Sequence, residues 1–545
     1  MIDRLRENWP VLALLATLWA AVALVHWSLF GWTYWDFGDG NYMYIARRVR
    51  EGLTLYRDIL APQPPLHILG GVVAGGLGDL LLGSDLAGIR VYTFLVRIAG
   101  SGMLFLLAWR YFRSPWMALG AVAIFLTLPI GFWWSIGYQS ENIQLVFLLA
   151  ALFLLISWDR RQVAGAGACM ALAAHCDMTT VPYLLVTALF LAFRRPRLLG
   201  WFAGAAAAVY IPIAVITEIL TSGYFTNNVI FNQAGTFPRT DILAASAAQT
   251  GHGPASFLQY AWGKITGEGL KVLHLEGGFL VLAAFGMGVL AHRAARAGDA
   301  EPAAKWHRTE FLLWMGIGLF LSICFTAKGG TVNYVFVLAE PAVALFSAYG
   351  LSLIWKAAAR GGVPGGWRAV LNLKDTRHFL RFFFPALVLA LAYMPAIPNL
   401  RATLTERQSE IPERDVLAIQ TFIETYAAPG DTILAPPFYA FLTRTNVAAE
   451  LAENYIWQIK WMNEEFDGVR GEGVDKMEEL AEVLRRREAR VVLLDMGQTG
   501  LVPVVRDAIR EHYQQAEPQP IQTRNTRLGL YIPRDVEIRH FPLTE

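Results

Sequence analysis

The chain has 545 residues, of which 55% are hydrophobic and only 17% are charged. Soluble domains carry about 25% charged residues, so this composition excludes an ordinary soluble protein and indicates a polytopic helical membrane protein. The 18 tryptophans fit a protein with aromatic belts at both membrane interfaces. A net charge of +2 gives no sign of a nucleic-acid partner. The three cysteines, all in or beside apolar segments, indicate neither a disulfide framework nor a metal cluster.

The first apolar segment runs from about Pro10 to Trp32 and follows two arginines. It has no small-residue cleavage site, so we expect a retained first span rather than a signal peptide. Further spans with basic flanks are predicted near residues 89–109, 116–134, 142–157, 163–174, 181–193, 198–216, 277–291, 310–327, 334–355 and 382–397. With the N-terminus in the cytoplasm, these eleven spans place every basic loop inside, as the positive-inside rule requires. The C-terminal residues then lie outside a bacterial inner (plasma) membrane.

One further apolar segment, Leu66–Gly83, is rich in glycine and contains Asp79. If it were a twelfth span, it would invert the topology of everything downstream and put the basic loops outside. We therefore expect a re-entrant or juxtamembrane helix that packs against protein, where irregular backbone is tolerated. An ordinary span is the alternative.

The composition changes beyond Asn399, where strand-like runs such as "GDTILAPP", "ARVVLLD" and "LGLYIP" alternate with helical patterns such as "RDVLAIQTFIETYA" and "VPVVRDAIREHYQQ". This alternation predicts a small soluble α/β domain. The expected architecture is thus a transmembrane module, residues 1–398, followed by a periplasmic α/β domain, residues 399–545. The main outer segments of the module are a first loop, 33–65, and a long loop, 218–276.

The first outer loop contains "YWDFGDGNYMYIARRVREG", residues 34–52. Asp39 is expected to cap the start of a helix and Gly52 to end it. Apolar residues fall on one face and the arginines of 47–50 on the other, which predicts an amphipathic helix lying on the outer membrane surface. Asp36 and Asp39 would then stand at its N-terminal end, beside the mouth of the bundle. A purely structural alternative stays open, in which Asp39 only caps the helix and Asp36 is only a solvated loop residue.

Other outer boundaries also carry polar groups. No Walker, HExxH or GxSxG motif accompanies them. Each has a simple structural alternative, such as a helix cap, a satisfied polar pair or a snorkelling lysine. Carboxylate, amide and cationic groups on one face of an apolar bundle nevertheless suit a lipid-linked anionic substrate. These candidates are Tyr42, Arg57, Glu141, His175, Asp177, Arg239, Lys328, Asn333 and Tyr334.

The order of several segments resembles a known family. After the first span come "DFGDGNYMYIARRVREGLTLYRD", "PQPPLHIL", "GIRVYTFLVRIAG", "YQSENIQLVFLLAALFLL" and "NYVFVLAEPAVAL", and the chain ends in the outer α/β domain. This arrangement is similar to the type C glycosyltransferase superfamily (GT-C fold), in particular to bacterial members akin to protein O-mannosyltransferases and the lipid A aminoarabinose transferase. The likeness covers nearly the whole chain as an architecture, and its specific part is the first outer loop.

The resemblance implies an inverting membrane hexosyl- or pentosyltransferase of the cell envelope that takes its sugar from a polyprenyl phosphate. The acceptor would be a lipid, a polysaccharide or a protein, and membrane lipids would surround the bundle. An aspartate of the first outer loop would be the general base, which maps to Asp39, with Asp36 the close second. Relatives often carry a second acidic residue where Glu141 stands. The cations implied for the donor phosphate are Lys328, Arg57 and Arg239.

The resemblance implies no required cofactor. Some relatives hold a divalent metal between the two acidic loops, but this chain lacks an Asp-x-Asp motif, so we expect no required metal. Weak binding of one by Asp39 and Glu141 is the alternative.

Two other classes of protein compete with this interpretation. A lipid or sugar transporter (flippase) predicts an inverted internal repeat and charged residues near span midplanes. No repeat is visible in the sequence, and the polar candidates gather at one face. A mere membrane anchor for the outer domain leaves the polar outer loops unexplained.

Overall fold

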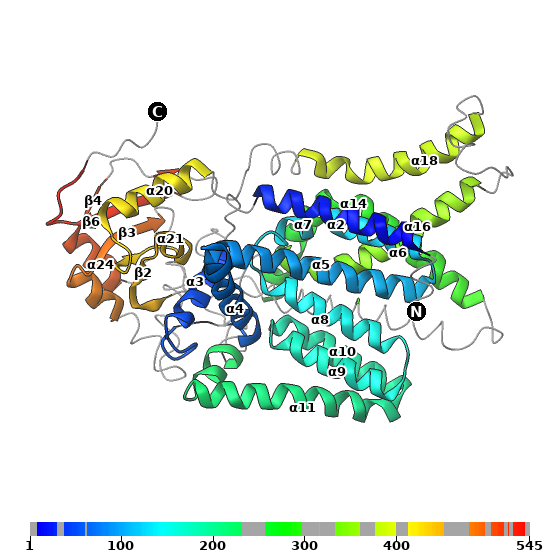
Figure 1. Cartoon of the computed structure of the whole chain (residues 1–545), viewed down its shortest axis with the longest axis horizontal. Coiled ribbons are helices and arrows are strands. Elements are labelled where there is room, and N and C mark those ends of the chain that lie inside the picture. The colour runs from blue at the N-terminus through cyan, green and yellow to red at the C-terminus, as the bar shows by residue number, and fades with distance from the viewer. Residues whose placement is uncertain are drawn as a thin grey trace.

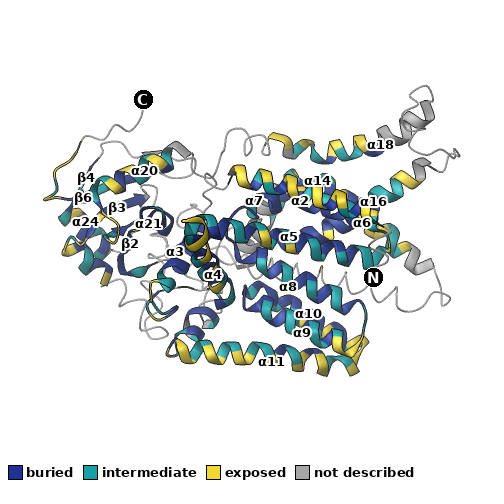
Figure 2. Cartoon of the chain, in the orientation of Figure 1, coloured by how far each residue is buried: buried dark blue, intermediate teal, exposed yellow. Residues whose placement is uncertain are grey.

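The computed structural model describes residues 8–29, 37–59, 61, 63–231, 257–296, 316, 333–359, 376–398, 413–451, 479–495, 503–516, 521–522 and 527–539. These residues form an elongated helical bundle with a small α/β unit at one end (Figure 1). Buried residues fill the middle of the bundle, whereas many residues on the outer helix α11 are exposed (Figure 2).

The helices of the bundle follow the predicted spans closely. A single span was expected over 116–134, but the structure divides it into α6 and α7 at Leu128, whose backbone is extended. Pro129 explains the break, because a proline disfavours helical geometry at the residue before it. The helices are α2 (Trp9–Leu29), α5 (Asp85–Phe112), α6 (Pro115–Thr127), α7 (Pro129–Trp134), α8 (Ser140–Leu155), α9 (Arg160–Ala174), α10 (Val181–Arg194), α11 (Pro196–Leu220), α14 (Phe257–Arg296), α16 (Glu340–Ala359) and α18 (Thr376–Tyr393).

Short helical turns connect some of these helices: η1 (Met178–Thr180), η2 (Thr226–Phe231), η4 (Asn333–Leu338) and η5 (Met394–Ala396). The long outer segment predicted over 218–276 includes the first part of α14, which begins at Phe257, and the apolar part of this helix covers Val272–His292. The outer position of this segment stays a prediction. Of the span predicted over 310–327, only residue 316 lies within the described residues.

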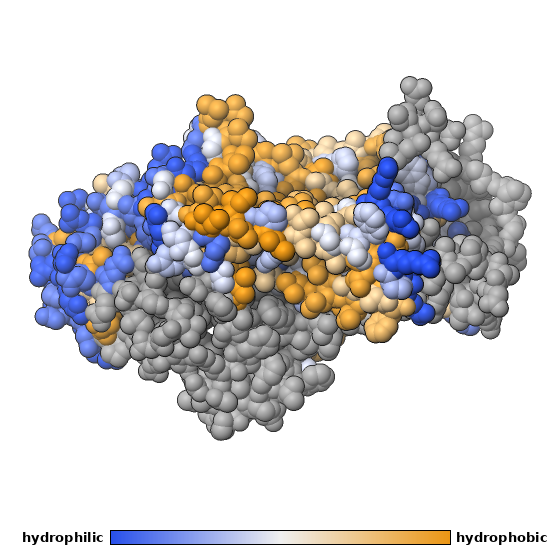
Figure 3. All heavy atoms as spheres, turned by 90° about the horizontal axis from the view of Figure 1, so that it is seen from below, coloured by the Kyte–Doolittle hydropathy of each residue, from blue (hydrophilic) through white to orange (hydrophobic). Residues whose placement is uncertain are grey.

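The surface of the bundle is that of a membrane protein. Within the described part of the chain, five helices are long and apolar enough to cross a membrane: α2, α4, α5, α11 and the Val272–His292 part of α14. Large apolar side chains are exposed on them, such as Leu24, Leu80 and Ile219, each more than 70% exposed. Figure 3 shows an apolar belt between two hydrophilic ends. Lipid chains therefore form the natural surroundings of this belt.

Helix α4 (Pro65–Leu82) is the segment whose role was ambiguous. Figure 1 shows it running across the end of the bundle, at a steep angle to α5, α8 and α11. Its backbone touches that of α5 directly: a Cβ added at Gly88 would lie 2.4 Å from the Cα of Gly78. Helix α4 is also long and apolar enough to be an ordinary span, so its juxtamembrane position stays a prediction, as does the count of eleven spans.

The C-terminal unit contains the predicted helices and strands. One sheet has the order β2-β1-β3-β6-β4, with β5 paired to β6; β1 is parallel to β2 and β3, and the remaining pairs are antiparallel. Val416, Ile419 and Ile423 form the buried stripe of α20, as their spacing predicts. The elements are α20 (Glu413–Tyr426), β1 (Thr432–Leu434), α21 (Pro437–Thr443), β2 (Asn446–Val447), η6 (Ala448–Glu450), β3 (Ala489–Asp495), α24 (Pro503–His512), β4 (Tyr513–Gln515), β5 (Ile521–Gln522) and β6 (Arg527–Pro533).

Helix α3 (Phe37–Arg50) is the predicted amphipathic helix, but its surroundings differ from the prediction. Every residue from Asp39 to Arg47 is buried, because α3 is enclosed between the end of the bundle and the C-terminal unit. The expected position flat on the membrane surface is therefore wrong. The helix ends at Arg50, and Gly52, the glycine expected to end it, follows in a turn with φ +104°. It begins at Phe37, so Asp39 belongs to its first turn and is not its N-cap.

Candidate active site

The centre of the candidate site is a fully buried ion pair between Asp39 of α3 and Arg90 of α5. The guanidinium donates one hydrogen bond to each carboxylate oxygen, with N–O distances of 2.7 and 2.6 Å. Such a bidentate, charge-assisted pair fixes the relative position of its two groups. Loss of either partner would leave the other charge buried and uncompensated.

The loop between α7 and α8 closes over this ion pair. Arg90 also donates to the carbonyl of Ile136 at 3.2 Å, and the backbone N–H of Tyr138 donates to Asp39. The Tyr138 hydroxyl donates to the carbonyl of His67, at the start of α4. These hydrogen bonds join four elements at one point: the first outer loop, α4, α5 and the α7–α8 loop.

Tyr42, His67 and Tyr138 form a buried aromatic group beside the ion pair. The centroid of the His67 ring lies 4.1 Å from that of Tyr138 and 4.7 Å from that of Tyr42. Tyr42 was a candidate substrate-binding residue, and the structure places it in this interior packing with 6% of its surface exposed.

Glu141 and Asp177 lie on adjoining elements of the same region. Glu141 is in the first turn of α8 and is 5% exposed. Its neighbour Ser140 donates a hydrogen bond of 2.7 Å to Asp177, which also accepts the backbone N–H of Thr179 at 2.8 Å and so caps η1. The structure therefore brings the second and third outer segments together, as the predicted convergence requires.

His175 and Asp177 do not form the pair that the sequence allowed as an alternative. The His175 ring stacks on Tyr210 with a centroid distance of 4.4 Å, and its Nε2 lies 3.1 Å from the Tyr210 carbonyl. The carbonyl of His175 accepts the backbone N–H of Leu66 at 3.0 Å. His175 thus connects the C-terminal end of α9 to the start of α4.

The remaining candidate residues have other positions. Arg57 is half-exposed and binds Asp58 at 2.8 Å, and its guanidinium lowers the pKa of that carboxyl to about 2. The predictions for Asp36, Arg239 and Lys328 lie outside the described residues. The backbone of Asn333 and Tyr334 forms the start of η4, and their side chains also lie outside the description.

Sequence reasoning did not single out Arg90 or a second buried arginine, Arg97. Both occur in "GIRVYTFLVRIAG", seven residues apart inside a predicted span, and so lie on one face of α5. An ionisable residue inside a membrane segment is rare and almost always has a partner or a function. This was the signal in the sequence that pointed to them.

Arg97 belongs to a second buried polar cluster, with Glu276 of α14 and Glu340 of α16. One Arg97 nitrogen lies 4.0 Å from a Glu340 oxygen, and the same nitrogen donates to the carbonyl of Phe125 at 2.7 Å. Glu276 accepts the backbone N–H of Ile130 at 3.0 Å. The three ionisable side chains are each at most 3% exposed. The cluster binds both sides of the break between α6 and α7, where helical hydrogen bonds are lost.

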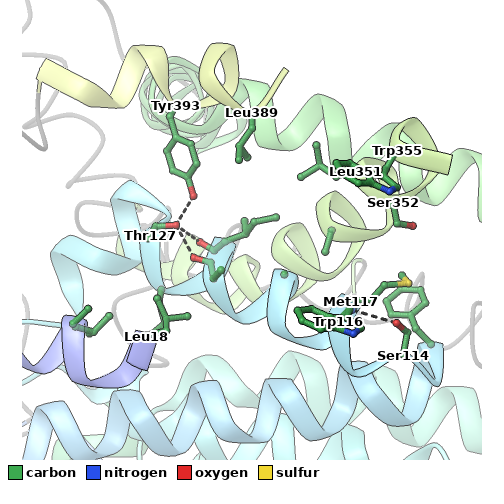
Figure 4. Close-up of a pocket in the computed structure, with 18 of the residues that line it drawn as sticks. Leu18, Ser114, Trp116, Met117, Thr127, Leu351, Ser352, Trp355, Leu389 and Tyr393 are labelled. Carbon is green, nitrogen blue, oxygen red and sulfur yellow. Dashed lines mark hydrogen bonds between the residues drawn. The ribbon is translucent and has the colours of Figure 1, made fainter. Parts of the chain in front are cut away.

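An apolar groove of about 910 Å³ runs along α6 on the side of the bundle. Its walls come from α2, α6, α16 and α18, with apolar side chains such as Leu18, Leu351 and Leu389 (Figure 4). Ser114 and Trp116 lie at one end of the groove, and Thr127, whose hydroxyl is hydrogen-bonded to that of Tyr393, lies at the other.

Helix α7 links the groove to the loop around the ion pair. Phe132 of α7 lines the groove, and α7 continues directly into the loop that holds Asp39 and Arg90. The groove and the candidate site are therefore connected through one stretch of chain, from Phe132 to Ile136, whose carbonyl accepts a hydrogen bond from Arg90.

No family model matches the chain, and no curated protein matches it. Solved structures, in contrast, do match the chain. The apo oligosaccharyltransferase of Archaeoglobus fulgidus gives a TM-score of 0.54 at 13% identity, covering 96% of this chain and 75% of that chain. ArnT from Cupriavidus metallidurans, bound to undecaprenyl phosphate, also gives 0.54 at 13% identity, covering 95% of this chain and 98% of that chain. This chain has the fold of the type C glycosyltransferases.

The resemblance inferred from the first outer loop is thereby confirmed as a likeness of fold. A third structure of the type C fold, AglB from Archaeoglobus fulgidus with an inhibitory peptide and a dolichol-phosphate, covers 98% of this chain at a TM-score of 0.52 and 13% identity. An identity this low shows a common fold, and the reaction has to be argued from this chain's own residues.

Proposed function

We propose that this protein is an inverting membrane glycosyltransferase, which moves a sugar from a polyprenyl-phosphate donor to an acceptor hydroxyl at the outer face of a bacterial inner membrane. The observation that carries the proposal is the convergence of the first outer loop and the α7–α8 loop on the buried Asp39–Arg90 pair, with the segment of Asp177 joined to them through Ser140. The same bundle carries an apolar groove. A polar site and an apolar groove on one bundle suit a substrate with an anionic head and a hydrocarbon chain.

The reaction needs a general base and a cation from the protein. The acceptor oxygen attacks the anomeric carbon from the side opposite the phosphate, the bond between that carbon and the phosphate oxygen breaks, and polyprenyl phosphate leaves. A carboxylate takes the proton of the acceptor hydroxyl, and a cation compensates the charge that grows on the departing phosphate. One base and one cation therefore suffice.

The first outer loop supplies the base in this proposal. Asp39 is closed off from solvent, and both of its oxygens accept hydrogen bonds from Arg90. We infer that Asp39 anchors the loop and that Asp36, three residues earlier, takes the proton. Glu141 and Asp177, on the adjoining elements, are proposed to bind the acceptor or the sugar.

The contacts of the described residues also bear on which cation binds the donor phosphate and on whether a metal is required. Lys328 remains the proposed partner of the donor phosphate, with Arg239 as an alternative; Arg57 is a weaker candidate because it already pairs with Asp58. The described residues contain no group of three or more metal-ligating side chains. Binding of a metal by Asp39 would require its pair with Arg90 to break, so we propose that no metal is required.

The groove is the proposed site of the polyprenyl chain. ArnT and AglB have been solved with undecaprenyl phosphate and dolichol-phosphate, so this fold accommodates such lipids. A chain in the groove of α6 would place its phosphate at the Thr127 end, close to α7 and the ion pair. The proposed topology keeps eleven spans, a cytoplasmic N-terminus and the C-terminal unit in the periplasm.

The first test is a transfer assay with a panel of polyprenyl-phosphate sugars and with lipid, polysaccharide and protein acceptors. Asp36→Asn should lower the rate of transfer about 10²- to 10⁴-fold, the usual contribution of a general base. Its thermal midpoint should match that of the wild type. Wild-type protein that transfers no sugar from any donor of the panel would contradict the proposed function, and full activity of Asp36→Asn would remove Asp36 as the base.

The second test fills the groove. Gly120 lines it, and a Cβ added there would lie 3.8 Å from the Cβ of Ala348 across it. Gly120→Leu should raise the KM for the donor about tenfold or more, because the leucine occupies volume that the lipid chain needs. Gly204→Leu is the matched control, since nothing lies within 4 Å of its added Cβ on α11. An unchanged KM for the donor in Gly120→Leu would place the lipid elsewhere.

A transporter remains the second candidate, and one observation favours it. The cluster of Arg97, Glu276 and Glu340 is a set of ionisable groups inside the bundle, which transporters commonly use. Its contacts with the broken backbone of α6 and α7 nevertheless give it a structural role. Movement of labelled lipid across a reconstituted vesicle membrane, without transfer of sugar, would support the transporter.

A further inference from the structure

We propose that Arg47 is a positioning residue, through which the C-terminal unit holds α3 and thereby keeps the acidic first turn of that helix in its working position. The inference rests on the proposed transferase function for its catalytic consequence. Its structural part, the clamp between α3 and the C-terminal unit, stands on contacts alone.

The clamp begins with Arg47, which is 7% exposed. Its guanidinium donates to the backbone carbonyls of Phe441, Ala440 and Thr445, at 2.7, 2.9 and 3.1 Å. It also lies over the Phe441 ring, 5.2 Å from the centroid. The planar guanidinium thus donates to three backbone carbonyls between α21 and β2. The single ammonium group of a lysine cannot reproduce this arrangement.

Two neighbours on α3 reinforce the same contact. The Tyr44 hydroxyl donates to Glu450 at 2.9 Å and accepts the backbone N–H of Val447 at 2.7 Å. Arg48 donates to both oxygens of Glu450, at 3.2 and 2.5 Å. Because these groups are largely buried, the contact is worth far more than a solvated surface ion pair.

The contact extends to the residue next to Asp39. A Cβ added at Gly40 would lie 2.3 Å from the Cβ of Phe438 and 2.9 Å from its Cα. Only glycine allows α3 and α21 to approach this closely. The C-terminal unit therefore touches α3 both at its acidic first turn and two turns later, at Arg47.

These contacts make α3 a helix held from two sides. Asp39 binds Arg90 of the bundle, and Arg47, about 12 Å further along the helix, binds the C-terminal unit. Tyr42, Met43 and Ile45 also belong to one buried apolar cluster together with residues of α20, α21 and the sheet. A shift of the C-terminal unit would thus carry α3 with it, and a misplacement of about 1 Å can cost a reaction about 10²-fold.

The test compares Arg47→Gln and Arg47→Lys with Arg486→Gln in the full-length protein. Arg486 lies in the same unit but is exposed, and among the described residues it pairs with Glu482 and Glu488. We expect Arg47→Gln to lower kcat about 10- to 100-fold with less than a twofold change in the KM for the donor, because geometry and not binding is lost. Amide hydrogens of 37–50 should exchange faster than in the wild type. Arg47→Lys should recover little, and Arg486→Gln should match the wild type in both measurements.

A second variant distinguishes loss of the clamp from misfolding of the whole protein. Glu450→Gln keeps the shape of the contact but removes the charge that Tyr44 and Arg48 bind, so it should change kcat and exchange in the same direction with a smaller magnitude. Wild-type kcat together with wild-type exchange in Arg47→Gln would overturn the proposal. An equal loss of kcat in Arg486→Gln would overturn it as well. If the wild type transfers no sugar, the proposed function fails, and unchanged exchange in Arg47→Gln still decides against the clamp.

Discussion

Asp39→Asn should lower the free energy of unfolding by about 3–5 kcal/mol, because it leaves the Arg90 guanidinium buried without its counter-charge. The rate of sugar transfer should fall as well, because the first outer loop loses the ion pair that holds it in place. The thermal midpoint of purified protein in detergent measures the first effect, and the transfer rate per folded molecule measures the second. A stability equal to that of the wild type would show that the pair is not formed.

A double variant separates anchoring from catalysis. Asp39→Asn with Arg90→Met removes both charges, keeps an acceptor for the Tyr138 N–H, and fills the space of the arginine with an apolar chain. Removal of both charges leaves no uncompensated buried charge, whereas removal of one partner alone does. We expect the double variant to recover stability and much of the transfer rate. Recovered stability with a rate still reduced about 10²-fold or more would instead identify Asp39 as the base.

The sequence predicted much of the fold because its patterns are local. Apolar runs with basic flanks marked the bundle helices, and the spacing of Val416, Ile419 and Ile423 marked a helix of the C-terminal unit. The break at Leu128 was also visible in principle, since Pro129 follows it. The extra length of α14 before Gly277 was not predicted, because its polar first half resembles a loop in composition.

The surroundings of α3 were beyond local prediction. An amphipathic helix has the same pattern whether its arginines face lipid phosphates or protein carbonyls. The partners of Arg47 and Arg48 lie about 400 residues away in the chain, at Phe441 and Glu450. Likewise, Asp39 was identified as a chemically important residue, but nothing near it in the sequence identified Arg90 as its partner.

Arg97→Met should destabilise the protein by about 3–5 kcal/mol, because it leaves the carboxyl groups of Glu276 and Glu340 buried without their cation. It also removes the donor to the Phe125 carbonyl at the end of α6. The thermal midpoint in detergent is the measurement. Arg197→Met, at an exposed position at the start of α11, is the control and should unfold with the wild type.

The compensating change on the other side of the cluster is Glu340→Gln. Combined with Arg97→Met it removes the cation together with one of the two carboxyl groups, while Glu276 keeps its hydrogen bond from the Ile130 N–H. Glutamine has nearly the shape of glutamate, which matters because the Glu340 carboxylate lies directly against Gly131. The double variant should therefore unfold at a higher temperature than Arg97→Met alone. If both unfold at the same temperature, the charge balance of the cluster does not hold the break between α6 and α7 together, and apolar packing around Phe125 must do so.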